Sequence, residues 1–167
     1  GKLIQGNIVE VTDSEGIVKT YSATSIVIAT GARSKELPSL KQDGKRIIGY
    51  REAMTLSEQP SSMVVVGSGA IGSEFANFYQ SIGTSVTLIE FLPRIVPNED
   101  EEVSKQLERS FKKMKMKIIT DSSVESVETS GEKCKVSIKT PKGIEIHEAD
   151  IVLSAVGVAT NIEGIGL

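Results

Sequence analysis

The sequence has little of several residue types that build common functional sites. Among 167 residues there is no tryptophan, one cysteine and one histidine, and aromatic residues make up 4%. One cysteine cannot form an internal disulfide, and one cysteine with one histidine do not form a metal-ligand cluster. So few aromatic side chains leave no visible stacking platform for nucleic-acid bases. We therefore expect no disulfide framework and no metal site.

A strong charge bias and long apolar runs are also missing. The formal net charge is −3, and no basic stretch offers a track for nucleic-acid phosphates. No apolar segment approaches the length of a membrane-spanning helix, and no signal-peptide pattern is visible. We expect a cytoplasmic protein with neither nucleic acid nor membrane as a partner.

The single histidine and the single cysteine both lie in alternating, strand-like stretches. His147 is expected on the surface of a strand over residues 144–148, and Cys134 is expected to be a half-buried structural thiol. Neither is expected to be catalytic, and the chain offers no catalytic nucleophile or general base of its own.

A glycine-rich turn is the most informative feature that is present. The apolar residues 62–66 enter a turn with Gly67, Gly69 and Gly72, a helical pattern follows, and residues 85–90 form a second strand that ends in an acid. The first glycine permits a sharp turn, the second lets a pyrophosphate approach the backbone, and the third lets the helix pack closely. This layout predicts a dinucleotide-binding βαβ unit. The alternative is a purely structural βαβ turn.

The acid at the end of the second strand indicates which nucleotide binds. Glu90 is expected to accept hydrogen bonds from the adenosine ribose hydroxyls, and its charge would repel the 2′-phosphate of NADP. Only Arg94 is close enough in sequence to hold such a phosphate. We therefore expect NAD rather than NADP, with a solvated strand end as the alternative role of Glu90.

The rest of the chain alternates strand and helix patterns and then changes to strands. We predict an α/β fold, with a Rossmann-like parallel sheet, helices on both faces and an antiparallel three-stranded meander. Expected strands cover residues 7–11, 18–21, 25–29, 62–66, 85–90, 117–119, 124–128, 134–139, 144–148 and 149–157, and expected helices cover residues 51–56, 71–82 and 99–114. The apolar helix faces would carry Ile71, Phe75, Phe78, Tyr79 and Ile82, and then Val103, Leu107, Phe111 and Met114.

Three segments resemble the two-dinucleotide flavoprotein disulfide reductases. Residues 28–32 are similar to the A-T-G segment of that family, and residues 66–74 are similar to its second glycine motif. Residues 90–97 resemble those of dihydrolipoamide dehydrogenases in particular, and the small Ala70, where glutathione reductases place a gating tyrosine, favours the same branch. The family's G-R-x-P-N segment is altered, because residues 157–161 here lack the arginine and the proline.

The resemblance implies roles for individual residues. The backbone of Gly69, Ala70, Ile71 and Gly72 would bind the NAD pyrophosphate. Further implied contacts are adenine with Val124, the nicotinamide half with Ala155 and Gly157, the flavin domain with Glu74, and FAD with Thr30 and Gly31.

The resemblance also implies what the whole protein would be. Residues 1–50 would be part of a FAD domain, residues 51–167 an NAD-binding domain, and the rest of the FAD domain and an interface domain would lie elsewhere in the same chain. The parent would be a homodimeric flavoenzyme that reoxidises the lipoyl domains of 2-oxoacid dehydrogenase complexes with NAD⁺, and this segment alone would be inactive. Alternatives are another NADH-dependent flavoprotein, of the mercuric reductase or NADH oxidase type, and a non-catalytic NAD-sensing module.

Overall fold

The chain forms two compact units. A computed structural model describes all residues from Gly1 to Leu167. Unit 1 comprises Gly1–Arg33 and Val158–Leu167, and unit 2 comprises Ser34–Gly157. The glycine-rich turn and the acid belong to unit 2, so that unit positions the candidate site.

Unit 2 is built on a five-stranded parallel sheet. Its strand order is β5-β12-β6-β7-β8, and every neighbouring pair is parallel. The bounds are β5 (Ile47–Ile48), β6 (Ser62–Val66), β7 (Ser85–Ile89), β8 (Lys117–Ile119) and β12 (Ile151–Ser154). The register aligns Val66 with Ile89 and with Ser154, so β6, β7 and β12 all end at one edge of the sheet.

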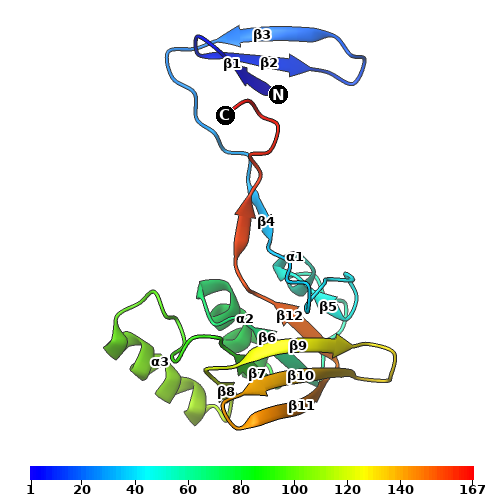
Figure 1. The fold of residues 1–167 in the computed structure, drawn as a ribbon, viewed down its shortest axis with the longest axis vertical. Helices are drawn as coiled ribbons and strands as arrows, with labels where there is room; N and C mark the ends of the chain where they lie inside the picture. Colours follow the sequence, from blue (N-terminus) through cyan, green and yellow to red (C-terminus); the bar gives the residue numbers. More distant parts are fainter. The chain divides into compact units, whose positions relative to one another are not determined.

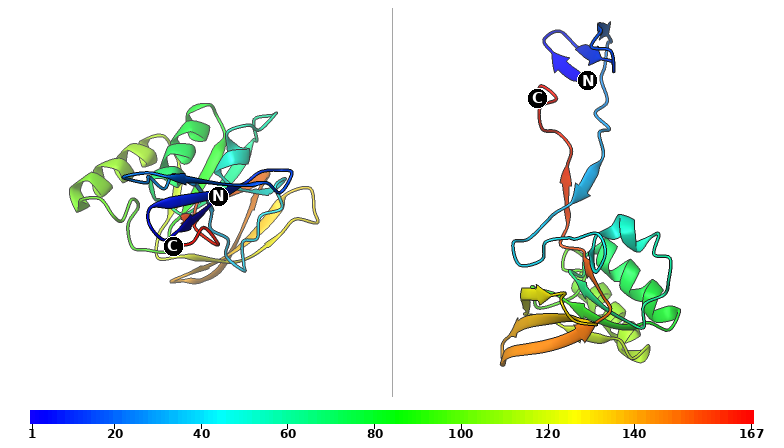
Figure 2. Two further views of the ribbon diagram at one scale, coloured as in Figure 1. Left: turned by 90° about the horizontal axis from the view of Figure 1, so that it is seen from above. Right: turned by 90° about the vertical axis from the view of Figure 1, so that its right-hand side faces the viewer.

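Two different layers cover the two faces of this sheet. The core on one face joins Met63, Val65 and Leu153 to side chains of α1 (Tyr50–Ala53), α2 (Ala70–Ser81) and α3 (Glu101–Lys113). The core on the other face joins Val64, Val66 and Val152 to the meander of β9 (Ser123–Glu128), β10 (Cys134–Thr140) and β11 (Gly143–Ala149). In the right-hand view of Figure 2 the meander and α2 lie on opposite sides of the sheet, as the element labels of Figure 1 identify them.

The α/β class, the parallel sheet and the three-stranded meander are confirmed. One detail is wrong, because all the helices pack on one face and the meander occupies the other. The strands of a parallel sheet are apolar on both sides and need cover on both. The inward side chains of β10, Val136 and Ile138, give that cover in place of a helix.

The two long helices, α2 and α3, form as expected. The apolar side chains expected on their buried faces are only partly buried. In α2, Tyr79 is buried and Phe78 is exposed, and the C-cap residue Ile82 is exposed as well. In α3, Val103 is 53% exposed, and Ser104 is buried instead because its hydroxyl donates to the Ile95 carbonyl oxygen at 2.5 Å. Hydrogen bonding to the preceding loop therefore turns a serine, not a valine, toward the core.

The meander shows which face of each strand is buried. Cys134 is fully buried on β10, which corrects the expectation of a half-buried thiol. On β11 the exposed side chains are Ile144 and Ile146, while the His147 side chain is only 12% exposed. His147 is therefore half-buried rather than fully on the surface, and its Nε2 lies 3.3 Å from Nζ of the exposed Lys117 and 3.2 Å from Glu145 Oε2. Alternation predicted the strand correctly, but the buried face is the one that carries His147.

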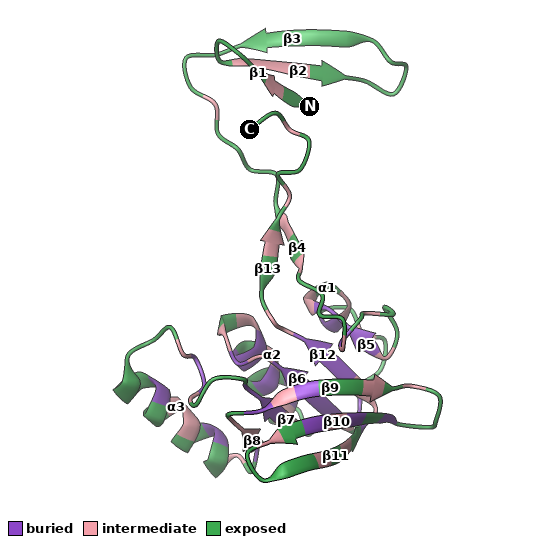
Figure 3. Cartoon of the chain, viewed as in Figure 1, coloured by how far each residue is buried: buried purple, intermediate pink, exposed green.

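Unit 1 consists largely of exposed strands. The antiparallel sheet β1-β2-β3 comprises β1 (Lys2–Ile4), β2 (Ile8–Thr12) and β3 (Val18–Ser22), and β4 (Ala32–Ser34) pairs with β13 (Val158–Thr160). The expected strand over residues 25–29 is absent, because no strand of the chain pairs with this segment, and Val27 is 87% exposed. Figure 3 shows that buried residues gather in unit 2. None of the three helices has both the length and the hydrophobicity that crossing a membrane requires.

Candidate functional site

A hollow of about 510 Å³ lies at the carboxyl edge of the parallel sheet. Its size is typical of sites for small molecules and cofactors. The ends of β6, β7 and β12 supply most of its wall, the start of β9 supplies another part, and the loop before β5 adds one leucine. The lining residues are Leu37, Val66, Gly67, Ser68, Gly69, Ile89, Glu90, Phe91, Ser122, Ser123, Val124, Ala155, Val156 and Gly157.

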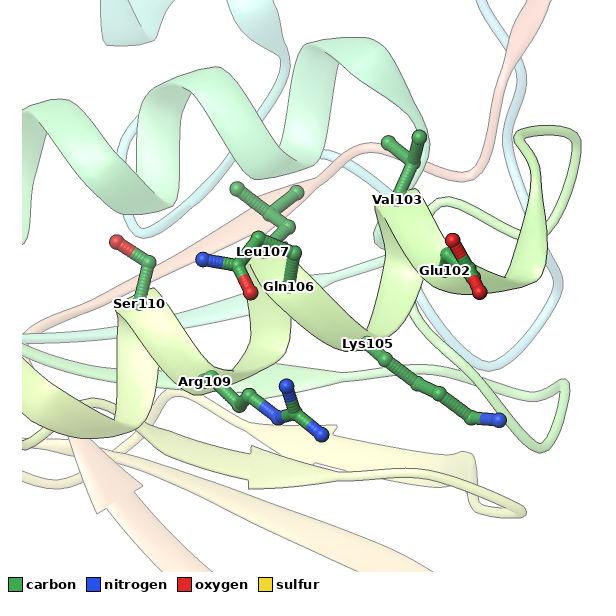
Figure 4. A pocket seen from close by; sticks show the side chains of 7 residues that line it. All are labelled: Glu102, Val103, Lys105, Gln106, Leu107, Arg109 and Ser110. Atoms are coloured by element: carbon green, nitrogen blue, oxygen red, sulfur yellow. The ribbon is translucent and has the colours of Figure 1, made fainter.

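A larger hollow, of about 960 Å³, follows one side of α3. Its lining comes from α3 alone, and most of the lining side chains are exposed. In Figure 4, Lys105 and Arg109 extend away from Val103 and Leu107. No buried polar group faces this hollow, so the hollow at the sheet edge is the candidate functional site.

The glycine-rich turn fits the space available to it. Gly67 has φ +96°, and a Cβ there would lie 2.5 Å from the Ala155 carbonyl oxygen. A Cβ on Gly72 would lie 1.8 Å from the Gly67 carbonyl oxygen. Real Cβ atoms do not come so close, so both positions require glycine if the turn keeps this shape. Gly67 and Gly72 therefore shape the turn.

Gly69 differs from the other two glycines because the space where a side chain would lie is open. No heavy atom outside its chain neighbours lies within 4 Å of a Cβ built there, and Gly69 lines the hollow. It is the N-cap residue of α2, and the first helical hydrogen bond runs from Ser73 N to Gly69 O at 2.9 Å. The first N–H groups of the helix have no partner within it, and they carry the positive end of the helix dipole. This open backbone can hold an anion.

Glu90 is a buried acid in the wall of the hollow, with 7% exposure. Its Oε2 accepts hydrogen bonds from Ser68 N at 2.8 Å and from Ser68 Oγ at 2.6 Å. Its Oε1 accepts one from Leu92 N at 2.9 Å. Burying a carboxylate without partners costs free energy, and the hydrogen bonds from these three donors offset that cost. The alternative role as a solvated strand end is therefore wrong.

The nearest arginine in sequence is directed at its own loop. Arg94 Nη2 donates to the Pro97 carbonyl oxygen at 3.0 Å and to that of Glu99 at 3.3 Å. Arg94 does not line the hollow, and neither does any other arginine or lysine. The only charged side chain in the wall is the Glu90 carboxylate. A second negative group placed next to this carboxylate would be repelled by it.

The structure distributes the other predicted site residues among three places. The predicted residues that line the hollow are Gly67, Gly69, Glu90, Val124, Ala155 and Gly157, whereas Gly72 does not line it. Ala70 and Glu74 line a separate hollow between α2 and α3, and Ile71 lines neither. Thr30 and Gly31 belong to unit 1, where Thr30 lines a hollow of about 350 Å³.

Sequence analysis missed several residues of the hollow. Ser68 and Ser122 are buried polar residues of its wall, and Leu37 comes from the loop before β5. Ser122 N donates to the Glu90 carbonyl oxygen at 3.0 Å, which joins the start of β9 to the end of β7. The only available signal was the position of Ser68 between two glycines of the turn. No group of three or more His, Cys, Asp or Glu side chains is arranged to hold a metal ion.

Comparison with known proteins relates the whole chain to one family. Residues 2–167 match the family model described as "Pyridine nucleotide-disulphide oxidoreductase". The chain is 39% identical over 170 residues to a dihydrolipoyl dehydrogenase of Mycobacterium leprae, covering 100% of this chain and 36% of the relative. It is 44% identical over 149 residues to a dihydrolipoyl dehydrogenase of Rhizobium etli, covering 89% of this chain and 31% of the relative. The chain thus spans about a third of the length of these curated relatives.

A solved structure gives the same relationship. LpdA of Mycobacterium tuberculosis superposes with a TM-score of 0.81 and 30% sequence identity, over 94% of this chain and 34% of LpdA. A match of this extent includes most of both units.

Proposed function

Because this chain belongs to the pyridine nucleotide-disulphide oxidoreductase family, we propose that residues 51–167 bind NAD in the hollow at the sheet edge. The observation that carries the proposal is the Glu90 carboxylate, buried in the wall and anchored by three donors, next to the open backbone at Gly69. A dinucleotide needs an anion site and an acceptor for ribose hydroxyls, and these two features supply them.

The chemistry of the lining residues fits the parts of the coenzyme. The pyrophosphate would lie against the N-terminus of α2, from Gly69 to Gly72, where N–H groups are free to donate. The adenosine ribose would donate to Glu90, and adenine would contact the apolar side chain of Val124. The nicotinamide half would extend past Ala155 and Gly157 on the other side of the turn. The coenzyme would supply hydride acceptance at its nicotinamide ring.

The residues of this chain would act by binding and orientation. The hollow's wall carries no histidine, cysteine or lysine, and its Ser68 hydroxyl is fully buried and donates to Glu90. Rate enhancement would therefore come from holding the nicotinamide in place. Glu74 would face a flavin domain beside the nicotinamide. NAD is favoured over NADP because the wall carries a carboxylate and no cation for a 2′-phosphate.

The whole protein, on this proposal, is a dihydrolipoyl dehydrogenase. The two relatives named above support it, since both carry that name. Residues 1–50 would be part of a FAD domain in which Thr30 and Gly31 contact FAD. The protein would be a cytoplasmic homodimer that oxidises the lipoyl domains of 2-oxoacid dehydrogenase complexes. The 167-residue chain alone would not turn over dihydrolipoamide.

Calorimetric titration of the purified protein with NADH and NADPH tests the coenzyme site. We expect NADH to bind with a Kd at least about tenfold lower than that of NADPH, since the loss of a charge-assisted hydrogen bond alone has that magnitude. Equal affinities would contradict the assignment of NAD, and no binding of either would contradict the site itself. Turnover of dihydrolipoamide by the 167-residue chain without added enzyme would contradict its proposed inactivity.

A further inference from the structure

Ser68 is fully buried and uses all its polar groups. Its N–H and its hydroxyl both donate to Glu90 Oε2, at 2.8 Å and 2.6 Å. Its carbonyl oxygen accepts from Ser73 Oγ at 2.8 Å and from Val96 N at 3.0 Å. One residue of the glycine turn is thereby tied to α2, to the loop before α3 and to the acid after β7.

We propose that Ser68 is a positioning residue that sets the preference for NADH over NADPH by fixing the Glu90 carboxylate. The inference rests on the proposed function, because it concerns the same coenzyme site. It adds a residue that touches neither the expected ribose position nor the pyrophosphate position through its side chain, since the hydroxyl is directed at Glu90.

The count of acceptor positions shows how the carboxylate is held. A carboxylate has about two acceptor positions on each oxygen. Ser68 fills both positions on Oε2, while Leu92 N fills one on Oε1. The remaining position is on Oε1, so that oxygen would receive a ribose hydroxyl. The side chain cannot turn away without breaking bonds to both Ser68 and Leu92.

A Glu90 carboxylate held in one position discriminates between NADH and NADPH better than a carboxylate that can move. A carboxylate that can rotate or withdraw lessens its repulsion of a 2′-phosphate, and it also bonds the ribose less well. Removing the Ser68 hydroxyl deletes the shortest of the three hydrogen bonds and leaves the two from backbone N–H groups. Affinity for NADH should fall and affinity for NADPH should rise, so that the ratio of the two dissociation constants shifts.

Titrations of the Ser68→Ala protein with NADH and NADPH test this role. We expect the preference for NADH, taken as the ratio of the NADPH Kd to the NADH Kd, to fall at least about fivefold, in keeping with the loss of one hydrogen bond to a charged group. Ser73→Ala is the matched control, because it also removes a buried hydroxyl that holds the turn but has no bond to Glu90. It should change the preference less than about twofold, because the bond it removes ends on the Ser68 carbonyl oxygen and all three donors to Glu90 stay in place. Ser68→Gly also lacks the hydroxyl and gives the same test if the alanine protein does not fold.

A second pair of titrations shows whether Ser68 acts through Glu90. In a Glu90→Gln background the further change Ser68→Ala should leave the coenzyme preference unaltered, because the charge to be positioned is gone. An unchanged preference in Ser68→Ala alone would overturn the proposal, and so would an equal loss in Ser73→Ala or an undiminished effect of Ser68→Ala in the Glu90→Gln background. If the parent protein binds neither coenzyme, the proposed function itself fails, which is a different result from any of these.

Discussion

Replacing Gly69 with valine is expected to remove coenzyme binding while unit 2 stays folded. Gly69 has φ −63° and ψ −173°, which lies in the extended region open to any residue, and no neighbouring atom lies within 4 Å of a new Cβ. Valine is a poor N-cap residue, at a cost of up to about 1 kcal/mol. Valine also has less conformational freedom than glycine in the unfolded chain, and this offsets part of that cost, by about 0.4–1 kcal/mol. The free energy of unfolding should therefore change by less than about 1 kcal/mol.

The loss of binding should be much larger. The valine side chain would occupy the space in front of the α2 N-terminus and keep a pyrophosphate from its N–H groups. A hydrogen bond to a charged group contributes about 1.5–3 kcal/mol, so losing two of them costs at least about 3 kcal/mol. The Kd for NADH should rise by at least about 100-fold. Calorimetric titration measures that rise, and circular dichroism with urea unfolding measures the stability of the same sample.

Gly72→Ala provides the contrasting control. Its Cβ would lie 1.8 Å from the Gly67 carbonyl oxygen, so the turn must deform, and overpacking of this kind costs about 1–3 kcal/mol. The two variants should therefore separate binding from folding. A folded Gly69→Val protein that binds NADH as tightly as the parent would refute the position of the pyrophosphate on this turn.

Three further outcomes follow from single contacts. Glu90→Arg should shift the ratio of NAD⁺ to NADP⁺ affinities at least about tenfold toward NADP⁺, because a charge-assisted hydrogen bond is lost and a repulsion removed; an unaltered ratio in titrations would contradict this. The hydrogen bond from Arg33 lowers the pKa of Glu163 to about 2, so the pair stabilises the fold fully above about pH 4.5 and stops doing so as the pH falls through about 2; NMR titration should find the carboxyl pKa raised toward its ordinary value after Arg33→Ala, and an unchanged pKa would contradict this. Burial raises the pKa of the Cys134 thiol, so Ellman's reagent should label it only after denaturant is added, and rapid labelling of the native protein would contradict its burial.

Sequence patterns were sufficient for features set by neighbours along the chain. The valines of β6, the glycine turn and the acid at the end of β7 lie close together in sequence, and each has a local cause. The start of α3 also has a local cause, because Asp100 is its N-cap and accepts from Glu102 N at 2.8 Å. These are properties of spacing and of residue type.

Features set by distant partners were not predictable from those patterns. The burial of Glu90 depends on a hydroxyl that lies 22 positions earlier, and the inward side of β11 depends on how the meander packs against the parallel sheet. The apolar run over residues 25–29 is as strand-like as β6, but a strand forms only where another strand pairs with it. Alternation therefore identifies a strand without identifying its partner or its buried face.

The two ends of unit 2 meet. Lys35 N donates to the Gly157 carbonyl oxygen at 3.0 Å, although almost the whole unit lies between these residues in the chain. A segment whose ends are neighbours can be cut out, closed with a short linker or opened elsewhere without stretching its backbone. Unit 2 therefore has the geometry of an exchangeable cassette. Related proteins with the same join could trade this segment, and its coenzyme preference with it, while the sequence on either side of the join stays unchanged.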